Sequence, residues 1–166
     1  MPTLSGDYFQ DTVSLLVDHN DDGAFGLVIN RPLDATISDV FPQIGGRFDC
    51  PVLEGGPVQQ DSIFFLHEGG REFQSTYRVS DEIYLTTSRD FVESMSKGEA
   101  PLRTLAIAGY AGWGSLQLEN EISNNLWLLV PANATIVFDT PFPDRAAAAA
   151  RILGIDLNLI SPISRQ

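Results

Sequence analysis

The chain has 166 residues, a net charge of −12 and 43% hydrophobic residues, which fits one globular domain (residues 1–166) with its own core. The charge disfavours direct binding to nucleic acid or anionic lipid, because both need clustered Lys and Arg side chains, whereas this chain has one lysine and scattered arginines. A single cysteine, no recognisable signal peptide and no apolar run near the roughly 20 residues of a membrane helix indicate a cytoplasmic protein without a disulfide or a membrane span.

Two apolar, β-branched segments, residues 12–18 and 24–29, flank the sequence HNDDG. Asp-Gly between apolar runs is a strong turn signal, so we predict a β-hairpin. The turn also matches the first half of an EF-hand calcium loop, but its twelfth position is Ile29 in place of a bidentate glutamate. We therefore predict no metal site in this turn.

The middle of the chain alternates short elements with Gly- and Pro-rich loops. Residues 36–41 fit one or two helical turns, and short strands are predicted at residues 52–53, 62–66, 76–79 and 83–86. The best helix signal covers residues 88–97: it opens with a hydroxyl and an acid, has apolar residues at helical spacing, and closes with Lys97 and a glycine.

We interpret residues 102–127 as the centre of the fold, around which the rest of the chain packs. This stretch predicts an apolar strand, a loop with three glycines that also holds Tyr110 and Trp113, and a helix at 116–124 with Ser115 as its N-cap. Two interpretations stay open for the aromatic pair: a packing hub, or the roof of a small-ligand pocket. Neither a nucleotide-binding glycine motif nor a serine-hydrolase motif matches the loop.

The last third of the chain predicts two more strands, residues 126–130 and 135–138, and then an alanine-rich helix at 144–153. The tail from Ile155 onward is expected either to add an edge strand or to lie on the surface.

Two groups of residues suit an anionic ligand. Thr87, Ser88 and Arg89 combine hydroxyls, a guanidinium and the free N–H groups of a helix start. Asn30 and Arg31 follow a strand end and would join the same site if the two ends converge. Helix capping and a structural ion pair of Arg89 would explain the first group without any ligand.

Other reactive side chains give no catalytic or metal-binding pattern. The two histidines, His19 and His67, stand apart without zinc-ligand spacing, and we expect surface or capping roles for both. Glu119 and Glu121 are two residues apart on a predicted helix, so their carboxylates diverge. We predict no catalytic residue, no metal and no cofactor.

Several motifs occur in the same order as in a known family. They are GAFGLVINRP (residues 23–32), GGPV (55–58), TTSRD (86–90), and GYAGWG followed by QLENEI (109–122). On these motifs the chain resembles the YqgE/AlgH family over essentially its whole length. Two positions depart from the family pattern: Leu116 replaces a usual glycine, and Ala146 replaces a usual aromatic residue.

The resemblance implies a bacterial cytosolic protein with an α+β fold, in which helices flank a mixed, partly barrel-like β-sheet. The resemblance assigns no catalytic residue and no cofactor to this chain. One branch of the family has the label of a transcriptional regulator of alginate synthesis, and the charge of this chain would make such regulation indirect.

The first functional hypothesis is a non-enzymatic binding or regulatory protein that acts through a protein partner or a small anionic ligand. The alternative is an enzyme, a hydrolase or transferase, that acts on a small anionic metabolite. A third is a structural or oligomerising module. The candidate ligand-binding residues are Asn30, Arg31, Thr87, Ser88, Arg89, Tyr110 and Trp113.

Overall fold

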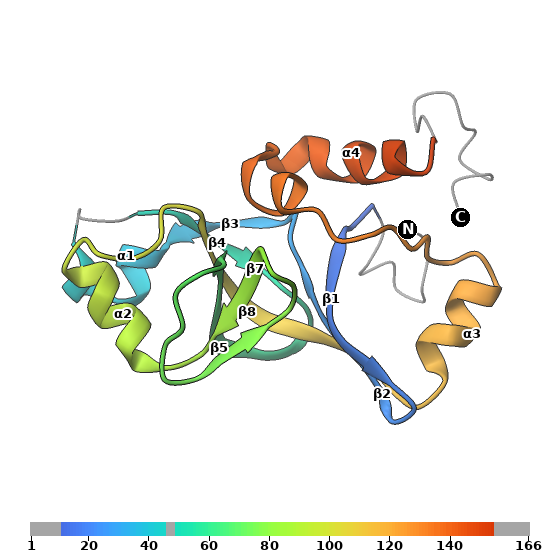
Figure 1. The fold of residues 1–166 in the computed structure, drawn as a ribbon, viewed down its shortest axis with the longest axis horizontal. Coiled ribbons are helices and arrows are strands. Elements are labelled where there is room, and N and C mark those ends of the chain that lie inside the picture. Colours follow the sequence, from blue (N-terminus) through green and yellow to red (C-terminus); the bar gives the residue numbers. More distant parts are fainter. Residues whose placement is uncertain (1–10, 46–48, 155–166) are drawn as a thin grey trace.

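A computed structural model describes residues 11–45 and 49–154 of the chain. Eight strands form one sheet, with helices at both ends and along one side (Figure 1). The strands are β1 (Ser14–Asn20), β2 (Gly23–Val28), β3 (Pro32–Thr36), β4 (Pro51–Glu54), β5 (Val58–Glu68), β6 (Thr76–Arg78), β7 (Ile83–Thr86) and β8 (Thr104–Trp113). The helices are α1 (Ile37–Val40), α2 (Arg89–Ser96), α3 (Gln117–Ser123) and α4 (Arg145–Ile152), with single turns η1 (Pro42–Ile44), η2 (Thr135–Asp139) and η3 (Phe142–Asp144).

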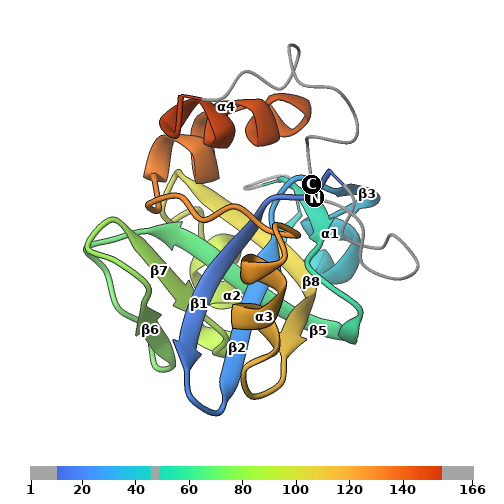
Figure 2. The ribbon, with the colours of Figure 1, turned by 90° about the vertical axis from the view of Figure 1, so that its right-hand side faces the viewer.

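The sheet is organised around β8, which pairs with three other strands. It is antiparallel to β2 and β5 and parallel to β4, so the sheet is mixed. The main path runs β1-β2-β8-β5-β7-β6, and β3 joins through β4. The sheet curls on itself (Figure 2). The predicted α+β fold with a partly barrel-like sheet is therefore confirmed.

Alternating side chains place the core on both faces of the sheet, because neighbouring residues of a strand point to opposite faces. One cluster includes Leu53, Leu66 and Ile107 and is closed by η2. The other includes Phe65 and Phe91 and packs under α1 and α2. Helices α1 and α2 therefore cover one face of the curled sheet, and η2 helps to close the other.

The predicted glycine loop at residues 109–114 is wrong, because β8 continues through Trp113. The glycines serve close backbone approach within the sheet. A Cβ on Gly56 would lie 2.1 Å from the carbonyl carbon of Tyr110, and a Cβ on Gly109 would lie 2.7 Å from the oxygen of Gly56. Gly109 also has φ of +80°, a conformation that side chains with a Cβ rarely adopt.

The hairpin and all three longer predicted helices are present, with ends shifted by one or two residues. The predicted N-cap of α3 is wrong, because Leu116 occupies that position with φ of +63°. The hydroxyl of Ser115 instead donates to the carbonyl oxygen of Asp21 at 2.7 Å, which ties the start of α3 to the β1–β2 turn.

The two strands predicted at 126–130 and 135–138 are also wrong. Residues 127–133 have no strand partner among the described residues, and residues 135–139 form the π-helical turn η2. Short apolar runs do not distinguish strand from helix. Here Asn133 fixes the turn, since its side-chain oxygen accepts from the N–H of Ile136 at 3.1 Å. The tail from Ile155 lies outside the described residues.

No helix in the described parts of the chain combines the length and apolar character needed to cross a bilayer.

Candidate functional site

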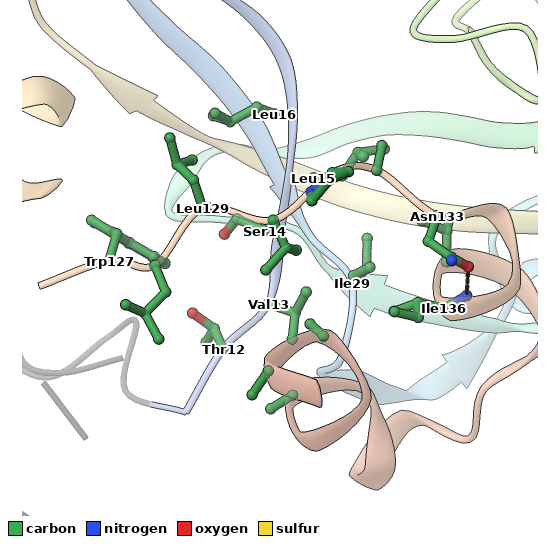
Figure 3. A pocket seen from close by; sticks show the side chains of 18 of the residues that line it. Thr12, Val13, Ser14, Leu15, Leu16, Ile29, Trp127, Leu129, Asn133 and Ile136 are labelled. Carbon is green, nitrogen blue, oxygen red and sulfur yellow. Dashed lines mark hydrogen bonds between the residues drawn. The ribbon is translucent and has the colours of Figure 1, made fainter. Parts of the chain in front are cut away.

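A pocket with a volume of about 320 Å³ lies between the first strand and the last helix (Figure 3). One wall is residues 11–16, which lead into and form the start of β1. A second wall is formed by residues 127–133. This segment runs from α3 toward η2 (Figure 2). The remaining lining side chains come from the end of β2, η2 and α4: Ile29, Ile136, Val137, Ala146, Ala149 and Ala150.

The sequence of α4 explains why this space stays open. Ala146, Ala149 and Ala150 have the three- and four-residue spacing that puts side chains on one face of a helix. Each presents only a methyl group to the pocket. With methyl groups alone on this face, α4 leaves the space beside β1 unfilled.

A buried arginine fixes α4 in place. Arg145 is only 2% exposed, and its Nε and Nη1 donate to the carbonyl oxygens of Thr140 at 2.8 Å and Ile29 at 2.6 Å. Its guanidinium also lies over the ring of Phe142, 4.5 Å from the centroid. Burial lowers the pKa of Arg145 to about 10, so the side chain stays charged at neutral pH. The helix is thereby anchored to the end of β2 beside the pocket.

The polar groups of the pocket are few. Ser14 contributes a hydroxyl whose oxygen is buried and has no hydrogen-bond partner among the described residues. Thr12 and Asn133 add a second hydroxyl and an amide. Among the described residues, Asp11 is the one ionisable residue of the lining, which includes no Lys, Arg or His from this part of the chain. The pocket is therefore mainly apolar, and its charge does not favour an anion.

Asn30, the first predicted site residue, positions one wall of this pocket. Its Oδ1 accepts from the N–H of Val13 and its Nδ2 donates to the carbonyl oxygen of Asp11, both at 3.0 Å. The side chain therefore holds residues 11–13 in place. Arg31 is half-buried, and its carbonyl oxygen accepts from the N–H of Glu54 at 2.8 Å.

Thr87, Ser88 and Arg89 lie at the start of α2, as predicted. The Ser88 hydroxyl donates to Asp90, and its oxygen accepts from the N–H of Ser75 at 3.0 Å. The backbone N–H of Thr87 donates to the carbonyl oxygen of Ser75. Arg89 is exposed. The hydroxyl of Ser88 thus serves the turn before β6, and an anion-binding role for these residues stays a prediction.

Arg31 and Arg89 adjoin strands that are not neighbours in the sheet. Arg31 precedes β3 and Arg89 follows β7, and β4, β8 and β5 lie between these two strands. Neither residue lines the pocket, so the described structure offers no support for one site that holds both arginines.

Tyr110 and Trp113 are packed into the fold. Tyr110 stacks on Phe25, with ring centroids 4.6 Å apart, and Trp113 is 6% exposed. The indole of Trp113 meets that of Trp127 edge to face at 5.7 Å. Both indole N–H groups donate to the same oxygen, Oε1 of Glu121, at 2.9 and 2.8 Å. This geometry supports the packing interpretation. Trp127 belongs to this aromatic cluster and also lines the pocket.

Sequence reasoning missed the pocket and gave His67 the wrong location. His67 is 0% exposed, and its Nδ1 lies 3.0 Å from the carbonyl oxygen of Glu68. A carbonyl only accepts, so Nδ1 carries the proton of the neutral ring, and Nε2 accepts from the Thr86 hydroxyl at 2.7 Å. Burial lowers the pKa of His67. The sequence feature that could have indicated burial is the position of His67 in the apolar run that forms β5.

Comparisons with known proteins agree along the whole chain. The family described as AlgH-like matches residues 1–158. A UPF0301 protein of Nitrosococcus oceani is 45% identical over 168 residues, which cover 97% of this chain and 89% of the relative. A UPF0301 protein of Hahella chejuensis is 46% identical over 167 residues, with 99% and 90% covered.

Solved structures show the same fold. The solution structure of the AlgH protein from Pseudomonas aeruginosa has a TM-score of 0.80 and 41% identity, over 96% of this chain and 87% of that chain. A crystal structure of a protein from Corynebacterium diphtheriae has a TM-score of 0.69 at 18% identity, over 92% and 80%, which shows likeness of fold alone.

Proposed function

This chain belongs to the AlgH-like family, and from that premise we propose that it is a non-enzymatic binding protein that holds a small apolar ligand in the pocket between β1, residues 127–133 and α4. The observation that carries the proposal is the pocket itself. Its volume of about 320 Å³ falls in the range of about 300–1,000 Å³ typical of small-molecule sites, which are mostly apolar with a few placed polar groups.

The surface beside the pocket supports a regulatory use of such binding. Leu128 and Leu129 line the pocket and are also 43% and 53% exposed. A ligand that packs against these residues would change the surface that they present to solvent. A protein partner that binds this surface would then distinguish the occupied pocket from the empty one. Any effect on transcription is then indirect, in keeping with the net charge of −12.

The enzymatic alternative has weaker support. It needs Arg31 and Arg89 on one anionic metabolite, and three strands lie between the strands that hold these residues.

The test uses Nile red, an uncharged dye whose emission rises and shifts to the blue in apolar surroundings. We expect the full-length protein to give this change and the variant Ala149→Phe to lose it, because the ring occupies the pocket. Ala147→Phe is the matched control, since Ala147 lies on the same helix and outside the lining. Equal dye binding by the two variants would overturn the proposal.

A further inference from the structure

A continuous chain of hydrogen bonds joins a buried histidine of β5 to the loop between β5 and β6. His67 and Thr86 are both 0% exposed, and Nε2 of His67 lies 2.7 Å from the hydroxyl oxygen of Thr86. That oxygen lies 2.8 Å from the hydroxyl of Thr76, the first residue of β6. The Thr76 oxygen in turn accepts from the N–H of Phe73, in the loop, at 2.7 Å. At the other end, Nδ1 of His67 contacts the carbonyl oxygen of Glu68 at 3.0 Å.

The neutral histidine fixes the direction of each bond in this chain. Nδ1 carries the ring proton because it faces a carbonyl oxygen, so Nε2 must accept from the Thr86 hydroxyl. Thr86 has one hydroxyl proton, and the bond between the two threonines is therefore donated by Thr76. With His67 neutral, every donor of the chain has an acceptor.

A proton on Nε2 reverses the chain. Nε2 becomes a donor to the Thr86 oxygen, and the Thr86 hydroxyl must then donate to Thr76. The two groups that contact the Thr76 hydroxyl among the described residues, Thr86 and the N–H of Phe73, are both donors in this state. The proton of the Thr76 hydroxyl is left without an acceptor. The unpaired donor thus arises where the chain meets the loop, and opening of the loop would let water pair with it.

The β5–β6 loop (residues 69–75) also covers the start of α2. The N–H of Gln74 donates to Oδ2 of Asp90 at 2.8 Å, and the N–H of Ser75 donates to the hydroxyl oxygen of Ser88 at 3.0 Å. The carbonyl oxygen of Ser75 accepts from the N–H of Thr87 at 3.1 Å. Opening of the loop would free the Ser88 hydroxyl and the Thr87 N–H.

The charged groups around His67 determine how the proton acts. Glu68 favours protonation of the ring, Arg71 of the loop opposes it, and the ring of Tyr84 lies edge to face at 6.0 Å. The uncharged side chains beside the ring come from β8, β7, the loop and α2: Thr104, Thr86, Phe73 and Phe91. Histidine is the side chain of this set whose ordinary pKa lies between 5 and 7.

Two pKa directions agree with proton-dependent opening of the loop. Burial lowers the pKa of His67, and an open loop removes part of that burial, so the open form binds the proton more tightly than the closed form. Burial opposes ionisation of Asp90, but its hydrogen bonds lower the pKa of its carboxyl overall. Asp90 therefore stays charged between pH 7 and 5 and does not release Gln74 in this range.

We propose that the chain from His67 to Thr76 is a proton-controlled latch: it holds the β5–β6 loop closed over the start of α2 while His67 is neutral, and the loop opens when His67 takes up a proton. None of the residues of the latch lines the pocket, so this inference does not rest on the proposed function.

The experiment measures amide hydrogen exchange of the full-length protein by NMR at pH 7.0 and 5.0, with each rate expressed as protection relative to the unfolded chain at the same pH. We expect protection of the Phe73 and Thr87 amides to fall about tenfold at pH 5.0. One coupled proton changes an opening equilibrium by at most about tenfold for each pH unit below 6.5.

Urea separates local opening from global unfolding. Opening of one loop exposes little surface, so exchange of the Phe73 amide should hardly change between 0 and about 1 M urea. The amide of Val28, which donates to the carbonyl oxygen of Gly55 at 2.8 Å, reports the core, and its exchange should accelerate with urea. If Phe73 follows Val28 in its dependence on both urea and pH, the proton acts through global unfolding and the latch is refuted.

A variant tests whether His67 is the group that titrates. His67→Gln keeps an acceptor for the Thr86 hydroxyl and cannot take up a proton, so protection of Phe73 should differ less than about twofold between the two pH values. His19→Gln, at the exposed histidine of β1, is the matched control and should keep the natural pH dependence. Natural pH dependence in His67→Gln would overturn the proposal.

A second measurement needs no variant. In a titration of the natural protein, the midpoint for the ring nitrogens of His67 should coincide with the midpoint for the Phe73 and Thr87 amide shifts. Separate midpoints, or amide shifts that do not change while the His67 ring titrates, would show that the proton does not control the loop.

Discussion

Arg145 and Ile29 are 116 positions apart in the sequence, yet a guanidinium N–H of Arg145 donates to the carbonyl oxygen of Ile29 at 2.6 Å. This bond joins the first turn of α4 to the end of β2, and both elements line the pocket. The position of α4 over the sheet therefore depends on one buried cation and the backbone groups that it pairs with.

Replacing Arg145 should destabilise the protein strongly. Arg145→Ala removes charged hydrogen bonds to two carbonyl oxygens, so we expect a loss of about 2–4 kcal/mol in the free energy of unfolding. Arg145→Lys should recover less than half of this, because an ammonium cannot reproduce the planar donor pair. Urea denaturation measures both. Arg151→Ala, at an exposed position of the same helix, is the control. A loss no larger than that of the control would refute the anchoring role.

Glu121 is the shared acceptor of two indole N–H groups, and its removal should loosen the wall that Trp127 contributes to the pocket. Glu121→Ala leaves two largely buried donors unpaired, at a cost of about 1–3 kcal/mol each. Glu121→Gln retains an acceptor oxygen and should cost much less. Near-ultraviolet circular dichroism and urea denaturation report the two effects. Equal destabilisation by Ala and Gln would contradict this account.

The sequence predicted local structure well and tertiary partners poorly. Helix α2 was visible from its own capping residues and apolar spacing, and the divergence of Glu119 and Glu121 followed from helix geometry. Nothing local indicates that Glu121 accepts from Trp127 as well as Trp113. The pocket is harder still, since Ser14 and Ala149 meet only after the whole sheet has formed.

The errors have the same origin. Residues 126–130 and 135–138 are apolar enough for strands, but the first segment does not pair with any strand of the described structure and the second lies in the π-helical turn η2. His67 looked like a strand-end surface residue because its burial depends on Phe73 and Phe91, which reach it from other elements.

Protonation of His67 should make stability depend on pH. Burial lowers the pKa of His67 in the folded protein below the unfolded value of 6.5, so the unfolded chain binds more protons at acid pH. The contribution of this residue is therefore complete above pH 6.5 and declines as the pH falls below it, by at most about 1.4 kcal/mol per pH unit. Urea denaturation at pH 7.5, 6.5 and 5.5 measures the decline.

The control for this prediction is His67→Phe, which keeps a ring in the same aromatic surroundings and cannot titrate. Its free energy of unfolding should fall less than that of the natural protein between pH 6.5 and 5.5. His19→Asn removes the exposed histidine and should leave the contribution of His67 in place. Parallel curves for the natural protein and His67→Phe would show that His67 is not responsible.

Direct DNA binding should be absent at physiological salt. With 22 acidic and 10 basic residues, the chain repels phosphate backbones more than it attracts them. In a gel-shift assay at 150 mM salt, we expect no sequence-specific complex at protein concentrations up to about 10 μM, near the range of non-specific binding by basic proteins. A tight, sequence-specific complex of the purified protein would rule out the indirect route.

Asn30 should affect the pocket without touching the ligand. Its amide holds residues 11–13 through the N–H of Val13 and the carbonyl oxygen of Asp11. Asn30→Ala removes both bonds, so we expect a stability loss of about 1–3 kcal/mol in urea denaturation and weaker binding of Nile red. Asn30→Asp keeps the acceptor for Val13 but turns a second acceptor toward the carbonyl oxygen of Asp11, so it should be at least as destabilising as Asn30→Ala. If Asn30→Ala lowers dye binding without any loss of stability, the residue contacts the dye directly, and the positioning role proposed for it would have to be abandoned.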